Sequence, residues 1–211
     1  MQTVGIIGGA GFIGSHLTQK FLAQGYRVKA SVTDPSKLEK YAHLNTFTNA
    51  NQLEIVALRV ENKAQTATFV EGCHIIIHAG TPFQLEVKDP KTELLDPTLQ
   101  GTEHLLEAAS RSKMLEKLVF VASVASYNTH FPLPPETKNP TEDTFNEQDT
   151  PFLSEESHPY GQAKFLANQN VEQFIQTHPN LGFDITSVSP VLVVGKALSS
   201  RADSTSSGLL F

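Results

Sequence analysis

Two side chains in the C-terminal third of the 211-residue chain have a spacing suited to proton transfer. Tyr160 and Lys164 are four residues apart, so on a helix the phenol and the ammonium lie one turn apart on the same face. Ser123 directly follows an apolar run that is a strand candidate, which predicts a hydroxyl at the strand's carboxyl end. A strand-end hydroxyl, a loop and then a Tyr/Lys helix suit acid–base chemistry at a substrate oxygen.

Glycines near the start of the chain indicate a second chemistry, the binding of a phosphate. The stretch from Gly8 to Gly14 follows a short apolar run and opens an amphipathic segment. In that context glycines permit a tight turn and close backbone approach to a pyrophosphate at a helix N-terminus. Two registers fit, one starting at Gly8 and one at Gly9. Dinucleotide binding is the prediction, and a purely structural glycine turn is the alternative.

The end of the second strand candidate bears on which dinucleotide binds. Enzymes that prefer NAD usually carry an acidic residue there, which holds the ribose hydroxyls and repels a 2′-phosphate. Val32 occupies that place, and Asp34, before Pro35, is expected to start a turn or to cap a helix beginning near Ser36. The candidates to face a 2′-phosphate are Thr33, Ser36, Lys37 and Lys40. They favour NADP, with NAD as the alternative; a solvated helix face is the competing interpretation of the two lysines.

The elements that must position these groups alternate along the chain. Six short apolar or β-branched runs are strand candidates, at residues 4–7, 28–32, 54–58, 74–78, 118–122 and 185–188. Four are apolar on both faces, as is typical of parallel strands covered by helices on either side. Helical periodicity fills the gaps, with apolar stripes at Phe12, Leu17, Phe21 and Leu22 and at Leu94, Leu95, Leu99, Leu105, Leu106 and Ala109. The pattern predicts an α/β fold with a right-handed, doubly wound parallel sheet, a Rossmann fold.

One long segment, residues 128–158, interrupts this alternation with five prolines and many polar residues. It is predicted to be loop. Because it leaves the carboxyl end of the fifth strand, where doubly wound sheets bind ligands, we expect it on the substrate side. A passive insertion is the alternative.

Composition and charge exclude several classes of protein. The net charge is −6 without a basic block, which argues against nucleic acid and anionic membrane surfaces as partners. No apolar run approaches the roughly 18 to 20 residues of a membrane helix, and no signal-peptide pattern precedes the first strand. Cys73 is the only cysteine, which excludes an intrachain disulfide and favours a reducing compartment. We expect a cytoplasmic protein without a metal site; His16 and His78 are predicted to be structural or cofactor-lining.

Taken together, these motifs resemble the extended short-chain dehydrogenase/reductase family, which includes NAD-dependent epimerases and dehydratases. The register Gly8-x-x-Gly11-x-x-Gly14 resembles its cofactor loop, residues 123–127 its serine strand end, and residues 160–164 its catalytic helix. The dihydroflavonol reductase-like branch of carbonyl reductases is most similar, on residues 32–35, 78–82, 97–98 and 190–195.

The resemblance implies a role for each matching residue. Tyr160 would be the acid or base at the substrate oxygen, Lys164 would hold the nicotinamide ribose and lower the pKa of the tyrosine, and Ser123 would orient the carbonyl. The cofactor-binding candidates are Gly8, Gly11, Phe12, Ile13, Gly14, Thr33, Lys37, Lys40, Ala79, Gly80, Thr81, Tyr160, Lys164, Pro190 and Val193. The expected activity is NAD(P)H-dependent reduction of an aldehyde or ketone to an alcohol. The alternatives are a nucleotide-sugar epimerase or dehydratase using NAD, and a non-catalytic dinucleotide-binding protein.

The chain also departs from that branch at identifiable positions. Thr33 stands where the branch has an arginine for the 2′-phosphate, Arg59 where many relatives have an aspartate near the adenine, and Thr98 where many have an asparagine. Relatives continue beyond Gly195 into a substrate lobe, which is largely absent here. We therefore expect a nucleotide-binding domain at residues 1–195 and the truncated start of a substrate lobe at 196–211. A homo-oligomer would cover the apolar surface left exposed.

Overall fold

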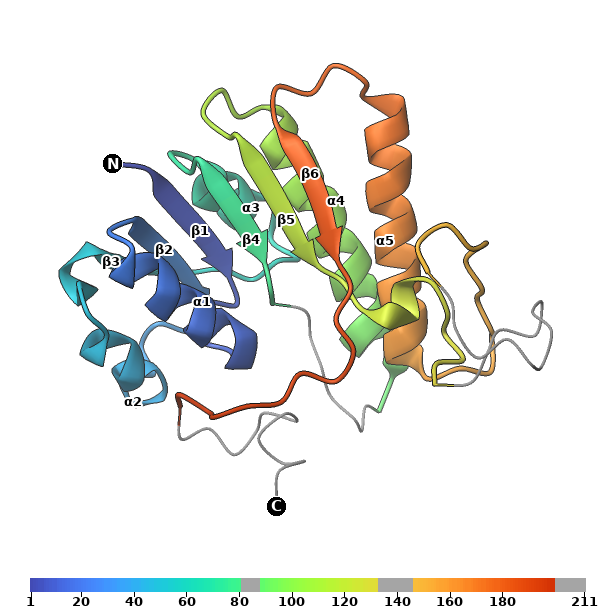
Figure 1. Ribbon diagram of the computed structural model, residues 1–211, viewed down its shortest axis with the longest axis horizontal. Coiled ribbons are helices and arrows are strands. Elements are labelled where there is room, and N and C mark those ends of the chain that lie inside the picture. Colours follow the sequence, from blue (N-terminus) through green and yellow to red (C-terminus); the bar gives the residue numbers. More distant parts are fainter. Residues whose placement is uncertain (81–87, 133–145, 200–211) are drawn as a thin grey trace.

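The structure, a computed structural model, describes residues 1–80, 88–132 and 146–199. A parallel sheet of six strands lies at its centre, in the order β3-β2-β1-β4-β5-β6 (Figure 1). The strands are β1 (Thr3–Ile7), β2 (Arg27–Val32), β3 (Leu53–Ala57), β4 (Ile75–His78), β5 (Lys117–Val121) and β6 (Asp184–Val188). All six strand predictions are confirmed, with ends shifted by at most one residue.

Helices cover the sheet on both faces. On one face lie α1 (Phe12–Ala23), α2 (Leu38–Tyr41) and the short turns η1 (Ala42–Thr46) and η2 (Ala50–Gln52). On the other lie α3 (Lys63–Val70), α4 (Asp96–Ser110) and α5 (Pro159–Thr177), with η3 (Lys91–Leu95) leading into α4 and η4 (Val124–Ser126) following β5. This is the predicted doubly wound α/β arrangement of a Rossmann fold.

Two apolar layers hold the helices to the sheet, one on each face. Ile6 belongs to the layer under α1, and its neighbour Ile7 to the layer under α3 and α4. Successive side chains of a strand point to opposite faces, so a strand covered on both sides must be apolar at every position. Both isoleucines are almost fully buried, and each such side chain contributes about 1.5–3 kcal/mol to stability.

The first helix differs in one respect from its predicted apolar stripe. Leu22 is buried as expected, but Leu17 and Phe21 are only half-buried, and Ser15 and Thr18 are buried in their place. Small side chains let α1 approach the sheet closely, and the Thr18 hydroxyl is satisfied because it donates to the Gly9 carbonyl at 3.1 Å.

The predicted loop at residues 128–158 is confirmed in its described parts. Residues 128–132 and 146–158 contain turns and a single bridge between Asn128 and Phe152, and no helix or longer strand. The bridge joins the two ends of the loop beside the N-terminus of α5.

The chain after β6 crosses the carboxyl end of the sheet toward α1 (Figure 1). His16 Nε2 on α1 lies 2.9 Å from the Lys196 carbonyl oxygen, and Leu198 packs against the layer under α1. Four apolar side chains at the last residue of β6 and along this path are more than half exposed: Val188, Val191, Leu192 and Val194. The expected domain boundary after Gly195 stays a prediction, and residues 200–211 lie outside the described residues.

Two other kinds of feature are absent from the described ranges. No helix there is both long and apolar enough to cross a membrane. The same residues contain no cluster of three or more histidine, cysteine or acidic side chains arranged to bind a metal ion.

Candidate active site

The glycine-rich turn lies at the carboxyl end of β1, where the strand order reverses between β2 and β4. Gly8 has a φ of +77°, and the Gly11 amide donates to the Gly8 carbonyl at 2.9 Å. Gly11 caps α1 without a side chain, so the first amides of the helix face outward at its partly positive end. Such a helix end favours an anionic ligand.

Close contacts explain why two glycines of the turn cannot carry a side chain. A Cβ on Gly14 would lie 2.0 Å from the Gly8 carbonyl oxygen, and a Cβ on Gly8 would lie 2.5 Å from the Gly80 Cα. Gly80, a predicted cofactor-binding residue, therefore also has a packing role, because it lets the ends of β1 and β4 approach each other. Ala79 continues this contact and donates its amide to the Ile7 carbonyl at 3.0 Å.

The turn after β2 is organised by Asp34, as predicted. Asp34 Oδ1 accepts from the Ser36 amide at 3.1 Å and from the Ser36 hydroxyl at 2.6 Å, and Oδ2 lies 3.8 Å from Lys37 Nζ. These hydrogen bonds, with a smaller contribution from Lys37, lower the pKa of the Asp34 carboxyl. The helix expected near Ser36 begins at Leu38. All four predicted 2′-phosphate contacts in this region are solvent-exposed: Thr33, Ser36, Lys37 and Lys40.

Ser123 and Tyr160 are brought together from elements that are distant in sequence. The two hydroxyls are neighbours, so the Ser123 hydroxyl favours the charged form of the Tyr160 phenol, and Ser123 Oγ accepts from the Ala125 amide at 3.3 Å. Pro159 is the first residue of α5, as predicted, and His158 Nδ1 caps the helix by accepting from the Tyr160 amide at 3.1 Å. The β5 end and the α5 start thus hold the two hydroxyls in place.

Lys164 lies one turn further along α5, almost fully buried behind the tyrosine. Only 7% of the residue is exposed; its Nζ donates to the Val121 carbonyl at 2.9 Å and lies 5.9 Å from the centroid of the Tyr160 ring. The Ser126 hydroxyl donates to the Lys164 carbonyl at 3.3 Å, which fastens α5 to the turn after β5.

Burial sets the titration of this group of side chains. It lowers the pKa of Lys164 to about 8, because an ammonium loses its hydration there. It also raises the pKa of the Tyr160 phenol, and the Ser123 hydroxyl offsets only part of this rise. The lowered tyrosine pKa implied by the family resemblance is therefore wrong in direction for this structure, since desolvation of the phenol outweighs the groups that favour its charged form.

His78 and Thr98 meet in the interior next to Lys164. They line a cavity of about 20 Å³ together with Lys164 and Asn168. The described residues give no hydrogen-bond partner to His78 Nδ1 or to Thr98 Oγ1, which is costly for buried polar atoms. Burial and the Lys164 charge lower the pKa of His78 to about 3, so the imidazole is neutral at pH 7. In the sequence, the signal for this buried polar cluster was His78, a histidine at the end of the apolar run that forms β4.

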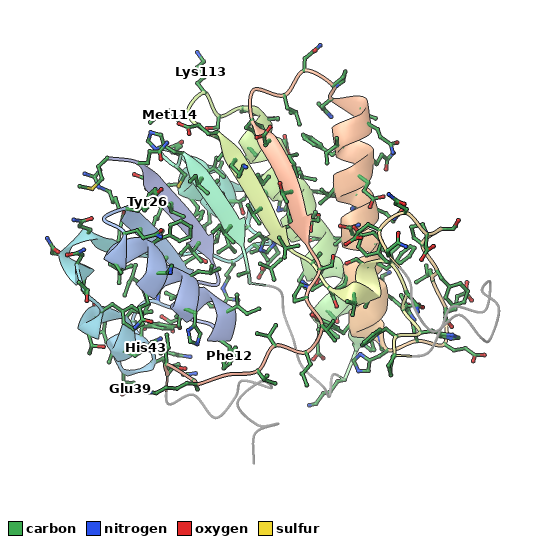
Figure 2. The ribbon with its side chains drawn as sticks, viewed as in Figure 1. Phe12, Tyr26, Glu39, His43, Lys113 and Met114 are labelled. Carbon is green, nitrogen blue, oxygen red and sulfur yellow. The ribbon has the colours of Figure 1, made fainter. Side chains whose placement is uncertain are left out.

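The remaining predicted contacts lie around the same end of the sheet. The Pro190 carbonyl accepts from the Val124 amide at 3.1 Å, next to Ser123, and Val193 is half-exposed on the crossing segment. Phe12 and Ile13 open α1, both half-buried. Figure 2 shows Phe12 and His43 at this end of the molecule, opposite Lys113 and Met114. The predicted residue Thr81 lies outside the described residues.

Comparisons with known proteins show what the chain is similar to. The profile of the NAD dependent epimerase/dehydratase family matches residues 4–210. Cinnamoyl-CoA reductase CAD2 of Medicago truncatula is 30% identical over 99% of this chain and 63% of its own length. Dihydroflavonol 4-reductase of Callistephus chinensis is 30% identical over 92% of this chain and 52% of its own length.

A solved structure is also similar. The crystal structure of Gre2 from Candida albicans, in complex with NADPH, superposes with a TM-score of 0.78 at 26% identity. The match covers 93% of this chain and 60% of that protein. The chain thus spans about half to three fifths of the length of these relatives.

Proposed function

Because the chain belongs to the NAD dependent epimerase/dehydratase family, we propose that it binds NADP(H) and reduces an aldehyde or ketone to an alcohol. The observation that carries the proposal is that the Ser123 and Tyr160 hydroxyls are neighbours, with the Lys164 ammonium buried behind the phenol. Two neighbouring hydroxyls at the open end of the sheet can both reach a carbonyl oxygen. The relatives with reductase names support this reading over the epimerase alternative.

Tyr160 acts as the proton donor in this proposal. Its raised pKa keeps the phenol protonated at neutral pH, as a general acid requires. The carbonyl carbon gains a hydride, which the nicotinamide supplies when bound, and the carbonyl oxygen takes the Tyr160 proton. The tyrosinate that forms is stabilised by the Ser123 hydroxyl and the nearby Lys164 charge.

Ser123 and Lys164 position the reacting groups. Ser123 Oγ is fixed after β5 because it accepts from the Ala125 amide, so the hydroxyl can hold the substrate oxygen against Tyr160. We assign the Lys164 ammonium, held by the Val121 carbonyl beside the Tyr160 ring, to the ribose of the nicotinamide half.

The dinucleotide would extend along the carboxyl end of the sheet. We assign the pyrophosphate to the turn that contains Gly8, Gly11 and Gly14, with Phe12 and Ile13 at the start of α1. Ala79, Gly80, Thr81, Pro190 and Val193 are assigned to the nicotinamide side. Val32 and the cations Lys37 and Lys40, with Thr33, favour NADP over NAD, and Gre2 of Candida albicans is a similar protein in complex with NADPH.

The domain organisation is part of the proposal. We propose that residues 1–195 bind the nucleotide and that residues from 196 onward begin the side that covers the substrate. A small carbonyl compound is the proposed partner, and a second copy of the chain is proposed to cover the exposed valines after β6.

The decisive experiment removes the phenolic hydroxyl alone. Tyr160→Phe is expected to lower NADPH-dependent turnover of a panel of aldehydes and ketones by about 10²- to 10⁴-fold. Dinucleotide affinity, measured by calorimetry, should stay unchanged, because the hydroxyl is assigned to the substrate oxygen. The matched control is Tyr26→Phe, since Tyr26 lies at the opposite end of the sheet (Figure 2). Full activity of Tyr160→Phe on every accepted carbonyl would overturn the mechanism, and NAD retained by the purified protein would favour the epimerase.

A further inference from the structure

The carboxyl ends of β2 and β3 lie side by side, which brings a second chain segment to the turn after β2. Val32 is paired with Ala57 in the parallel register, and the Leu58 amide donates to the Val32 carbonyl at 2.9 Å. Arg59 follows Leu58 immediately, so it leaves β3 at the level where Thr33 and Asp34 leave β2.

The Arg59 side chain is free to serve a ligand. Its backbone amide donates to Gln65 Oε1 at 2.8 Å, which fixes the main chain, while 59% of the side chain is exposed. The guanidinium lies 3.8 Å from the exposed Glu61 carboxylate, a loose surface pair that contributes little to stability. Its positive charge also reaches Asp34, where it adds to the lowering of that carboxyl's pKa.

The residues that follow β2 recognise a phosphate only weakly. Thr33 carries no charge, and Lys37 Nζ forms a pair with Asp34 at 3.8 Å that is as loose as the pair of Arg59 with Glu61. Lys40 is exposed on α2, and a lysine meets a phosphate as a point charge. An arginine presents two parallel donors that match a phosphate, and such charge-assisted bonds are the stronger kind.

We propose that Arg59 binds the 2′-phosphate of NADP(H), so that a cation from the end of β3 adds paired donors to the lysines that follow β2. The inference rests on the proposed use of a nicotinamide dinucleotide and adds the residue that selects between its two forms. The guanidinium exchanges its loose pair with Glu61 for a phosphate that carries about −1.5 to −2 charges at neutral pH. The Asp34 carboxylate keeps its two hydrogen bonds, which the Ser36 amide and the Ser36 hydroxyl donate.

The test is a calorimetric titration of NADPH and of NADH into the unaltered protein, Arg59→Ala, Arg59→Lys and Arg111→Ala. Arg59→Ala is expected to weaken NADPH by about ten- to a hundredfold while NADH changes little. Arg59→Lys should recover part of the loss, because it restores the charge without the paired donors. Arg111 is the matched control: it is an exposed arginine paired with Glu107 on α4, and its removal should alter neither affinity.

Different outcomes overturn different statements. If Arg59→Ala weakens NADPH and NADH equally, or weakens neither, the assignment of Arg59 to the 2′-phosphate is wrong while the reductase proposal stands. If the unaltered protein binds neither dinucleotide, the proposed function itself fails. If Arg59→Ala lowers stability, a salt titration gives a second readout. The preference for NADPH over NADH should shrink with added NaCl in the unaltered protein and in Arg59→Lys, because both carry a charge at this position. A preference that does not change with NaCl would overturn the inference.

Discussion

The two ends of the sheet handle charge in opposite ways. At the amino end, Lys117 and Asp184 are opposite each other at the starts of β5 and β6, with the charged atoms 3.9 Å apart and both side chains exposed. At the carboxyl end, the Lys164 ammonium is buried and shares its surroundings with the neutral imidazole of His78. Both ends belong to the same strands, so the difference reflects what is packed against each end.

This difference indicates that the carboxyl end of the sheet is less stable than it could be. Exposed pairs such as Lys117 and Asp184 contribute little, and losing them costs little. A buried ammonium whose pKa has fallen from 10.5 to about 8 opposes folding by about 3 kcal/mol at neutral pH. Buried charge that weakens the fold is typical of a site selected for activity, which supports placing the chemistry at the carboxyl end.

The largest expected effect comes from removing the buried ammonium. Lys164→Met should lower turnover by about 10²-fold or more, since both ribose contact and stabilisation of the tyrosinate are lost. The same change should increase the free energy of unfolding by about 1–3 kcal/mol and raise Tm by about 2–10 °C. Activity assays and thermal unfolding measure both. Lys117→Met at the amino end is the control, and a lower Tm for Lys164→Met would erase the contrast between the two ends.

A smaller effect is expected from pH. The unfolded chain binds a proton at His78 below about pH 6.5, whereas the folded protein excludes it until about pH 3. In that window the unfolded state holds more protons, so stability is lost as the pH falls, by about 2–3 kcal/mol near pH 4.5. Urea unfolding of His78→Asn between pH 7 and 4 should show a flatter dependence. His178→Asn, exposed at the end of α5, should keep the original slope; equal slopes in all three proteins would contradict the assignment.

The smallest effect is expected at the amino end. Asp184→Asn removes the partner of Lys117 without changing volume, and the free energy of unfolding should move by at most about 0.5 kcal/mol. Turnover should not change at all. If urea unfolding shows that Asp184→Asn lowers the free energy of unfolding by more than about 1 kcal/mol, the exposed pair matters for stability and the contrast between the two ends fails.

The sheet and its helices were largely predictable because each strand has a local signal in the sequence. Apolar and β-branched runs bounded by turn residues indicated all six strands, and Pro159 indicated the start of α5. The buried stripe of α1 was partly wrong, since periodicity selects large apolar residues while this helix packs through Ser15 and Thr18. Small polar residues give no signal of close packing unless the facing strand is known.

The candidate site was predictable in its members and less so in its electrostatics. The spacing of Tyr160 and Lys164 and the strand-end position of Ser123 predicted three side chains that the structure brings together, and their catalytic roles stay a prediction. The direction of the tyrosine's pKa was not predictable, because it depends on how deeply the phenol is buried. Likewise, that Arg59 lies beside the β2 turn follows only from the order of strands, which places β3 next to β2.

The position of β1 in the middle of an all-parallel sheet has a consequence for how the chain assembles. A parallel partner cannot be added by a tight turn, so every pairing in this sheet closes a loop that contains a helix or several turns. During synthesis β1, β2 and β3 can pair while β4 is still absent, and the free side of β1 must wait until the chain has passed α3. Such non-local closure slows folding and leaves a strand edge open to other chains in the meantime.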